Sequence, residues 1–88
     1  MYTLRREGDG AGDSGGMSDA IWRGEDGEIN RKQNARPRVG VALRVGSVYA
    51  RTYQDQDWWQ TSPITEILED REDYVRFRTG NSIYVWTK

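Results

Sequence analysis

Arginine and aromatic side chains alternate along the second half of the chain. One group runs from Arg44 to Trp59, and a second comprises Tyr74, Arg76 and Arg78. Such residues can stack on and hydrogen-bond the bases of a single-stranded nucleic acid. They are also enriched in the energetic centres of protein interfaces. The pattern therefore indicates a binding surface whose partner is either a protein or a nucleic acid.

Groups that would serve catalysis are scarce. The chain contains no histidine and no cysteine, which excludes a Ser-His-Asp triad, a Cys-His pair and the thiolate or imidazole ligands of most metal sites. Paired carboxylates remain, such as Glu66 with Asp70, but a β domain of about fifty residues offers no deep cleft in which they could act as acid and base. We expect no catalytic residue, no metal and no cofactor.

The elements that position these residues are short strands. Val39, Val41, Leu43 and Val45 recur at every second position, which predicts a half-buried strand over residues 39–45. A further strand is expected over residues 47–54, which are rich in β-forming residues. Another is expected over residues 64–68, directly after Pro63, which is tolerated at the start of a strand. Neighbours in a strand face opposite sides, so Trp58 and Trp59 cannot both enter one core.

The last hairpin is the best defined element. Gly80 and Asn81 have the composition of the two-residue loop of a type I′ or II′ hairpin. Such a loop sets a register in which the core pairs are Phe77 with Tyr84 and Val75 with Trp86. The opposite face of the hairpin then carries Tyr74, Arg76 and Arg78.

The first third of the chain has a different composition. Residues 1–30 hold seven of the ten glycines and seven acidic residues against three arginines, whereas residues 31–60 hold six basic residues and two acidic ones. Glycine loses much backbone entropy on ordering, and few apolar groups are present to offset that loss. We predict a flexible acidic arm with a basic linker over residues 1–36 and a β domain over residues 37–88. Within the arm, residues 17–22 could form a single helical turn. Its apolar residues would either pack loosely on the domain or form a docking motif anchored by Ile21 and Trp22.

Together these elements predict an all-β fold. About five short strands joined by turns indicate a small antiparallel SH3-like barrel or curled sheet, preceded by the flexible arm. No apolar run is long enough to cross a membrane, and no signal peptide is recognisable. We expect an intracellular, cytoplasmic protein.

The C-terminal quarter carries a resemblance. Thr61-Ser62-Pro63-Ile64, followed by residues 77–84 (Phe-Arg-Thr-Gly-Asn-Ser-Ile-Tyr), resembles the ends of small uncharacterised proteins of bacteria and their phages. The resemblance implies an accessory protein of a phage or mobile element, which would act as an inhibitor of a host system or as a small structural component.

The function expected from the sequence is non-enzymatic binding of a protein partner or a second copy of the chain. The alternative is a small β-barrel that binds single-stranded nucleic acid through the same surface, although the low isoelectric point of about 5.4 opposes the strongly positive field of such proteins. The candidate partner-binding residues are Trp58, Trp59, Tyr74, Arg76, Arg78, Ile21 and Trp22.

Overall fold

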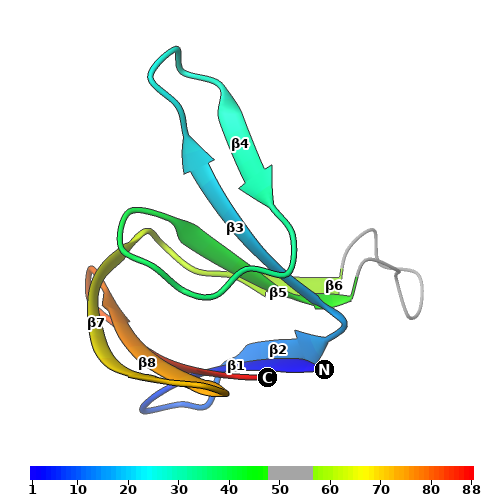
Figure 1. The fold of residues 1–88 in the computed structure, drawn as a ribbon. Helices are drawn as coiled ribbons and strands as arrows, with labels where there is room; N and C mark the ends of the chain where they lie inside the picture. The colour runs from blue at the N-terminus through cyan, green and yellow to red at the C-terminus, as the bar shows by residue number, and fades with distance from the viewer. Residues whose placement is uncertain (48–56) are drawn as a thin grey trace.

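A computed structural model describes residues 1–47 and 57–88 of the chain. These residues form nine strands and no helix (Figure 1). The strands are β1 (Tyr2–Arg6), β2 (Gly12–Gly15), β3 (Met17–Arg23), β4 (Ile29–Lys32), β5 (Ala42–Ser47), β6 (Asp57–Gln60), β7 (Ile64–Arg71), β8 (Tyr74–Thr79) and β9 (Ile83–Thr87). The all-β prediction is therefore confirmed, and none of the described residues belongs to a helix able to cross a membrane.

The strands form two antiparallel sheets. The five-stranded sheet has the order β2-β1-β9-β8-β7, and the four-stranded sheet has the order β4-β3-β5-β6. Figure 1 shows the five-stranded sheet curving below the four-stranded one, while the outer end of the β3–β4 hairpin, which belongs to the four-stranded sheet, projects away from the rest of the fold. Register shifts along β7, where it pairs with β8, are β-bulges that bend the five-stranded sheet. Among the described residues the sheets do not close into a barrel, so the SH3-like barrel stays a prediction.

The core lies between the two sheets. Leu4, Phe77 and Trp86 enter it from the five-stranded sheet, and Leu43 and Val45 enter it from the four-stranded sheet. Two hydrogen bonds cross the core. The indole Nε1 of Trp86 donates to Ser18 Oγ over 3.0 Å, and Nε1 of Trp59 donates to Tyr84 Oη over 3.2 Å.

The register predicted for the last hairpin is confirmed. Phe77 pairs with Tyr84 and Val75 with Trp86, and the rings of Phe77 and Tyr84 stack with centroids 5.6 Å apart. The predicted type I′ or II′ turn, however, is wrong. A type I′ or II′ turn needs a positive φ at its first central residue, and neither Gly80 nor Asn81 has a positive φ.

The flexible N-terminal arm is not confirmed, because residues 2–32 carry four strands, two of which pair with strands later in the chain. β1 pairs with β9, and β3 pairs with β5. Most of the glycines there serve turns or close contacts. Gly8, Gly10 and Gly27 have positive φ angles of 102°, 72° and 83°, which favour glycine. The segment thus gains its partners from distant sequence, which composition does not reveal.

Two further predictions need correction. Residues 17–22, expected as a helical turn, lie in β3, which pairs with β5 along residues 17–21 and with β4 along residues 20–23. The strand expected at residues 39–45 begins only at Ala42, because Gly40 has a φ of 96° and Val39 is 56% exposed. The strand predicted at residues 47–54 falls almost wholly outside the described residues.

Candidate functional site

The seven partner-binding candidates lie in three different places. The outer face of the four-stranded sheet carries Ile21 and Trp58. Its inner face carries Trp22 and Trp59, which pack against the core. The outer face of the five-stranded sheet carries Tyr74, Arg76 and Arg78. The structure therefore does not bring the candidates together into one contact face.

Trp58 and Trp59 face opposite sides of β6, as their adjacency predicts. Trp59 bonds to Tyr84 in the interior, and the guanidinium of Arg6 lies 5.2 Å from its ring centroid. Trp58 is half-buried on the outer face, where the guanidinium of Arg44 lies 4.6 Å from its ring centroid. Both tryptophans are partly exposed, and Trp58 is the one that lies on the outer face.

The arginines of β8 point away from the core, as predicted, but they already have acidic partners. Arg76 Nε lies 2.7 Å from Glu7 Oε1, and Arg78 Nη1 lies 3.0 Å from Glu66 Oε1. The hydrogen bond from Arg76 lowers the pKa of the Glu7 carboxyl, and the same bond raises the pKa of Arg76. The outer face of the five-stranded sheet is thus largely neutralised by its own carboxylates.

The outer face of the four-stranded sheet is different. Arg44 stands opposite Asp19 on one side and Gln60 on the other, and its Nε and Nη2 donate to Gln60 Oε1 over 3.1 and 2.8 Å. This double hydrogen bond holds the guanidinium over Trp58. We refer to the surrounding side chains as the arginine–tryptophan face, which comprises Asp19, Ile21, Arg31, Arg44, Trp58 and Gln60.

Asp19 lies at the centre of this face and is almost completely buried, with 1% of its surface exposed. Arg31 Nε approaches its Oδ2 to 2.6 Å, yet Oδ2 receives no hydrogen bond of good geometry, so the contact is an ion pair only. The two groups line a small hollow of about 180 Å³ together with Gly16, Met17, Gln33 and Asn34.

Arg44 feels the charges of both Asp19 and Arg31. Burial is the largest influence and lowers the pKa of Arg44. The positive charge of Arg31 lowers this pKa further, whereas the carboxylate of Asp19 raises it. A single buried carboxylate thus faces two guanidinium groups. The arginine–tryptophan face carries one net positive charge, although the whole chain carries a net charge of −1.

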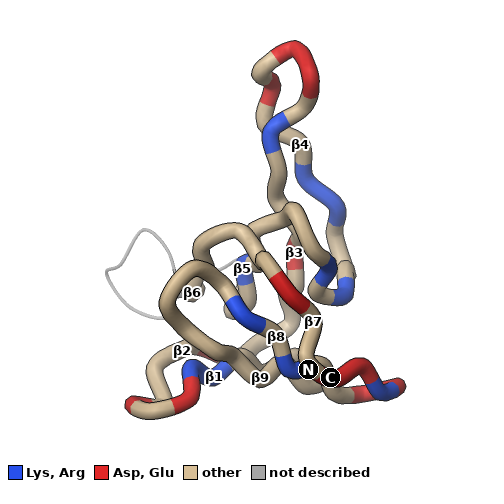
Figure 2. The backbone as a smooth tube through the Cα atoms, turned by 90° about the vertical axis from the view of Figure 1, so that its left-hand side faces the viewer, with Lys and Arg blue, Asp and Glu red and all other residues tan. Residues whose placement is uncertain are grey.

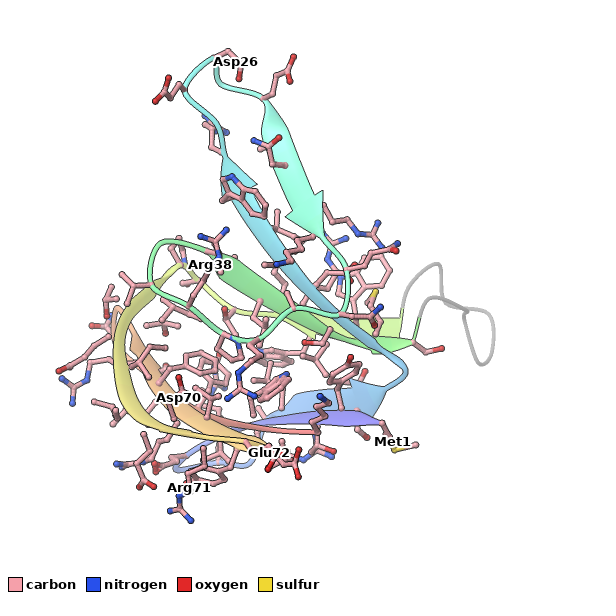
Figure 3. The ribbon with its side chains drawn as sticks, in the orientation of Figure 1. Met1, Asp26, Arg38, Asp70, Arg71 and Glu72 are labelled. Carbon is pink, nitrogen blue, oxygen red and sulfur yellow. The ribbon has the colours of Figure 1, made fainter. Side chains whose placement is uncertain are left out.

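Sequence reasoning missed how the arginines and tryptophans combine. Each of the four tryptophans has a guanidinium within 5.3 Å of its ring centroid, and the pairs are Arg6 with Trp59, Arg36 with Trp86, Arg38 with Trp22 and Arg44 with Trp58. Arg38 comes from the segment after β4 and lies at the foot of the projecting hairpin (Figure 3). Partners from such distant positions give no local signal in the sequence.

A second, more open hollow of about 550 Å³ lies between the β1–β2 turn and the β8–β9 loop. Its charged lining residues are Arg6, Glu7 and Asp9. Arg6 Nη2 lies 2.6 Å from Asp9 Oδ2, and Glu7 is paired with Arg76. Within residues 1–47 and 57–88, no three carboxylates gather closely enough to hold a metal ion. This hollow therefore presents paired charges and no recognisable reactive group.

Comparison of the chain with protein-family models, with curated proteins and with solved structures gives no match. The choice of a functional surface therefore depends on side-chain geometry. By that criterion the arginine–tryptophan face is the strongest candidate, because it combines a positioned guanidinium, an aromatic ring and an excess of positive charge.

Proposed function

We propose that the protein is a non-enzymatic interaction module that binds an acidic surface of a protein partner through the arginine–tryptophan face. The observation that carries the proposal is the Arg44 guanidinium, which Gln60 fixes over the ring of Trp58. Tryptophan and arginine are the side chains most enriched at binding hot spots. A guanidinium already held in place loses less conformational entropy when it meets a carboxylate.

The arginines over the tryptophan rings favour a protein partner over single-stranded nucleic acid. Base stacking needs an open ring face, and guanidinium groups already cover one face of Trp22, Trp58 and Trp59. The positive charge of the arginine–tryptophan face supports the alternative, a nucleic acid bound through its phosphates. The two partners are separable by experiment.

The five-stranded sheet is the weaker contact surface. Its arginines Arg76 and Arg78 would have to exchange the carboxylates of Glu7 and Glu66 for those of a partner. Such an exchange gains little, because one exposed ion pair replaces another. We therefore assign Tyr74, Arg76 and Arg78 a minor part in binding.

The non-enzymatic part of the proposal rests on the lack of histidine and cysteine in the sequence. The resemblance of the C-terminal quarter to small proteins of bacteria and phages supplies the proposed setting. In that setting the chain is a cytoplasmic accessory protein of a phage or mobile element, which would block a host protein or join a larger assembly by stoichiometric binding.

Capture from a host lysate with matched variants tests this function. Arg44→Gln removes the guanidinium from Trp58, and we expect it to weaken binding of the captured protein by about 2 kcal/mol, or about thirtyfold, as at a hot spot. Arg78→Gln, which removes the same charge from the opposite sheet, is the control and should bind almost as wild type does.

The same variants distinguish the two partners. If the captured species is nucleic acid and its binding falls log-linearly as salt rises, the alternative is correct. If Arg78→Gln weakens binding of a protein as much as Arg44→Gln does, the arginine–tryptophan face is not the contact surface.

A further inference from the structure

The hairpin of β3 and β4 extends beyond the two packed sheets (Figures 1 and 3). β4 is the outermost strand of its sheet, and in the described part of the chain β3 is the one strand that pairs with it. An unpaired strand edge offers backbone N–H and C=O groups to another chain. Ile29, at the start of β4, is 63% exposed.

The hydrogen-bond pattern shows which backbone groups of β4 face outward. The N–H of Gly24 donates to the carbonyl of Glu28 over 2.7 Å, and the N–H of Ala35 donates to the carbonyl of Ser18 over 2.8 Å. Antiparallel strands alternate between hydrogen-bonded and non-bonded pairs. Counting every second pair from the bonded pair of Gly24 with Glu28, the pairs of Trp22 with Asn30 and of Ala20 with Lys32 are also hydrogen-bonded. The residues between them on β4, Ile29 and Arg31, therefore direct their backbone N–H and C=O groups to the free edge.

Charge is distributed unevenly along this edge. Glu25, Asp26 and Glu28 make the tip of the hairpin acidic, whereas Arg31 and Lys32 make the foot of β4 basic. Figure 2 shows this arrangement along the projecting hairpin. When two such edges run antiparallel, the acidic end of one meets the basic end of the other.

We propose that two copies of the chain pair through their β4 strands. In the proposed register, Asn30 stands opposite Asn30 of the second copy. The outward backbone N–H and C=O groups of Ile29 then form hydrogen bonds with those of Arg31 in the second copy. Glu28 then stands opposite Lys32 of the second copy, and the symmetry repeats this ion pair. Two neighbouring registers also join outward groups. One places Arg31 opposite Arg31, which like-charge repulsion disfavours, and the other places Ile29 opposite Ile29 and Glu28 opposite Asn30, so that both Glu28–Lys32 ion pairs are lost.

The charges on this edge select its partner. A short edge strand with charged side chains normally resists pairing with unrelated strands. Here the charges that repel another edge are complementary to a second copy of the same edge. Neither Glu28 nor Lys32 makes a side-chain hydrogen bond or ion pair with another described residue, so both remain available to the second copy.

The pairing joins two four-stranded sheets into one of eight strands. The two-fold axis of an antiparallel pair is perpendicular to the sheet, so both arginine–tryptophan faces lie on the same side. This bivalence, which rests on the proposed function, would let a dimer hold a repeated partner more tightly than a monomer. The self-association itself does not depend on that function.

Sedimentation velocity over a concentration series, with light scattering for mass, tests the pairing on the intact 10.2 kDa chain. We expect wild type to form dimers. Glu28→Lys and Lys32→Glu each place like charges opposite one another at two sites, and each should raise the dimer dissociation constant by at least about tenfold. Glu25→Lys makes the same charge change outside the paired register and should have little effect.

The two variants also complement each other. A mixture of Glu28→Lys and Lys32→Glu pairs lysine with glutamate at both sites and should form a heterodimer, and the double variant should dimerise alone. A folding defect cannot produce this recovery. Salt should weaken wild-type association, because the ion pairs are exposed.

The inference is wrong if wild type stays monomeric throughout the series, or if each charge variant associates as strongly as wild type. A monomer that still captures its partner overturns the pairing alone. A dimer whose partner binding is unchanged by Arg44→Gln overturns the proposed function alone.

Discussion

Ser18 links the two sheets inside the core, and its replacement by alanine tests how they are held together. Its side chain is fully buried. Its Oγ accepts a hydrogen bond from Nε1 of Trp86 over 3.0 Å and donates one to the carbonyl of Ala35 over 2.9 Å. Ser18→Ala leaves a buried donor and a buried acceptor without this partner.

The size of the effect follows from these two groups. A buried polar group left without its hydrogen bond costs about 1–3 kcal/mol, so we expect Ser18→Ala to lower the free energy of unfolding by about 2–4 kcal/mol. For a domain of this length, that loss corresponds to a fall of about 10–30 °C in melting temperature. The small domain would lose a large fraction of its stability.

Urea unfolding followed by tryptophan fluorescence measures this change, with Ser62→Ala as the control because Ser62 is exposed. A double-mutant cycle with Trp86→Phe isolates the bond between the two side chains. We expect the combined loss to be smaller than the sum of the single losses by about 1 kcal/mol. If Ser18→Ala matches the control within about 0.5 kcal/mol, the sheets are not joined through Ser18.

Two further predictions concern the first strands. A Cβ added at Gly15 would lie 2.3 Å from the carbonyl oxygen of Gly46, whereas one added at Gly16 meets nothing within 4 Å. Gly15→Ala should therefore lower the unfolding free energy by about 1–3 kcal/mol, and Gly16→Ala should leave it unchanged. Thermal unfolding of the two variants measures this difference. Arg6 lowers the pKa of Asp9 from 3.8 to about 2, so this pair stabilises the fold above pH 4 and ceases to do so as the pH falls towards 2. Asp9→Asn should flatten the pH dependence of stability in that window, and an unchanged acid-unfolding profile would contradict the assignment.

The sequence was sufficient where the interacting residues are close together in the chain. The pairing of Phe77 with Tyr84 spans one tight connection, and strand alternation then places Arg76 and Arg78 on the opposite face. The same alternation correctly separates Trp58 from Trp59. It cannot tell which ring enters the core, because that depends on Tyr84, which lies on the other sheet.

The prediction of a flexible N-terminal arm was not confirmed, for the opposite reason. Leu4, Met17 and Ala20 are buried, but they are spread thinly among glycines and acids, and their partners lie far along the chain. β1 finds its neighbour in the last strand. Glycine content alone cannot distinguish a flexible segment from one whose glycines make turns and close backbone contacts.

By itself, the sequence determined the all-β class and the register of the last hairpin, because residue alternation and a two-residue loop constrain neighbouring residues. It also showed that arginine and aromatic side chains are available for binding. The tertiary structure decided which charges remain available. Glu7 meets Arg76 across 69 residues of chain, and Arg44 finds Trp58 and Gln60 on a neighbouring strand. Ion pairing and stacking act through space over a few ångströms. Only the folded arrangement therefore shows that, among the described residues, the arginine–tryptophan face keeps an unmatched positive charge and the arginines of β8 do not.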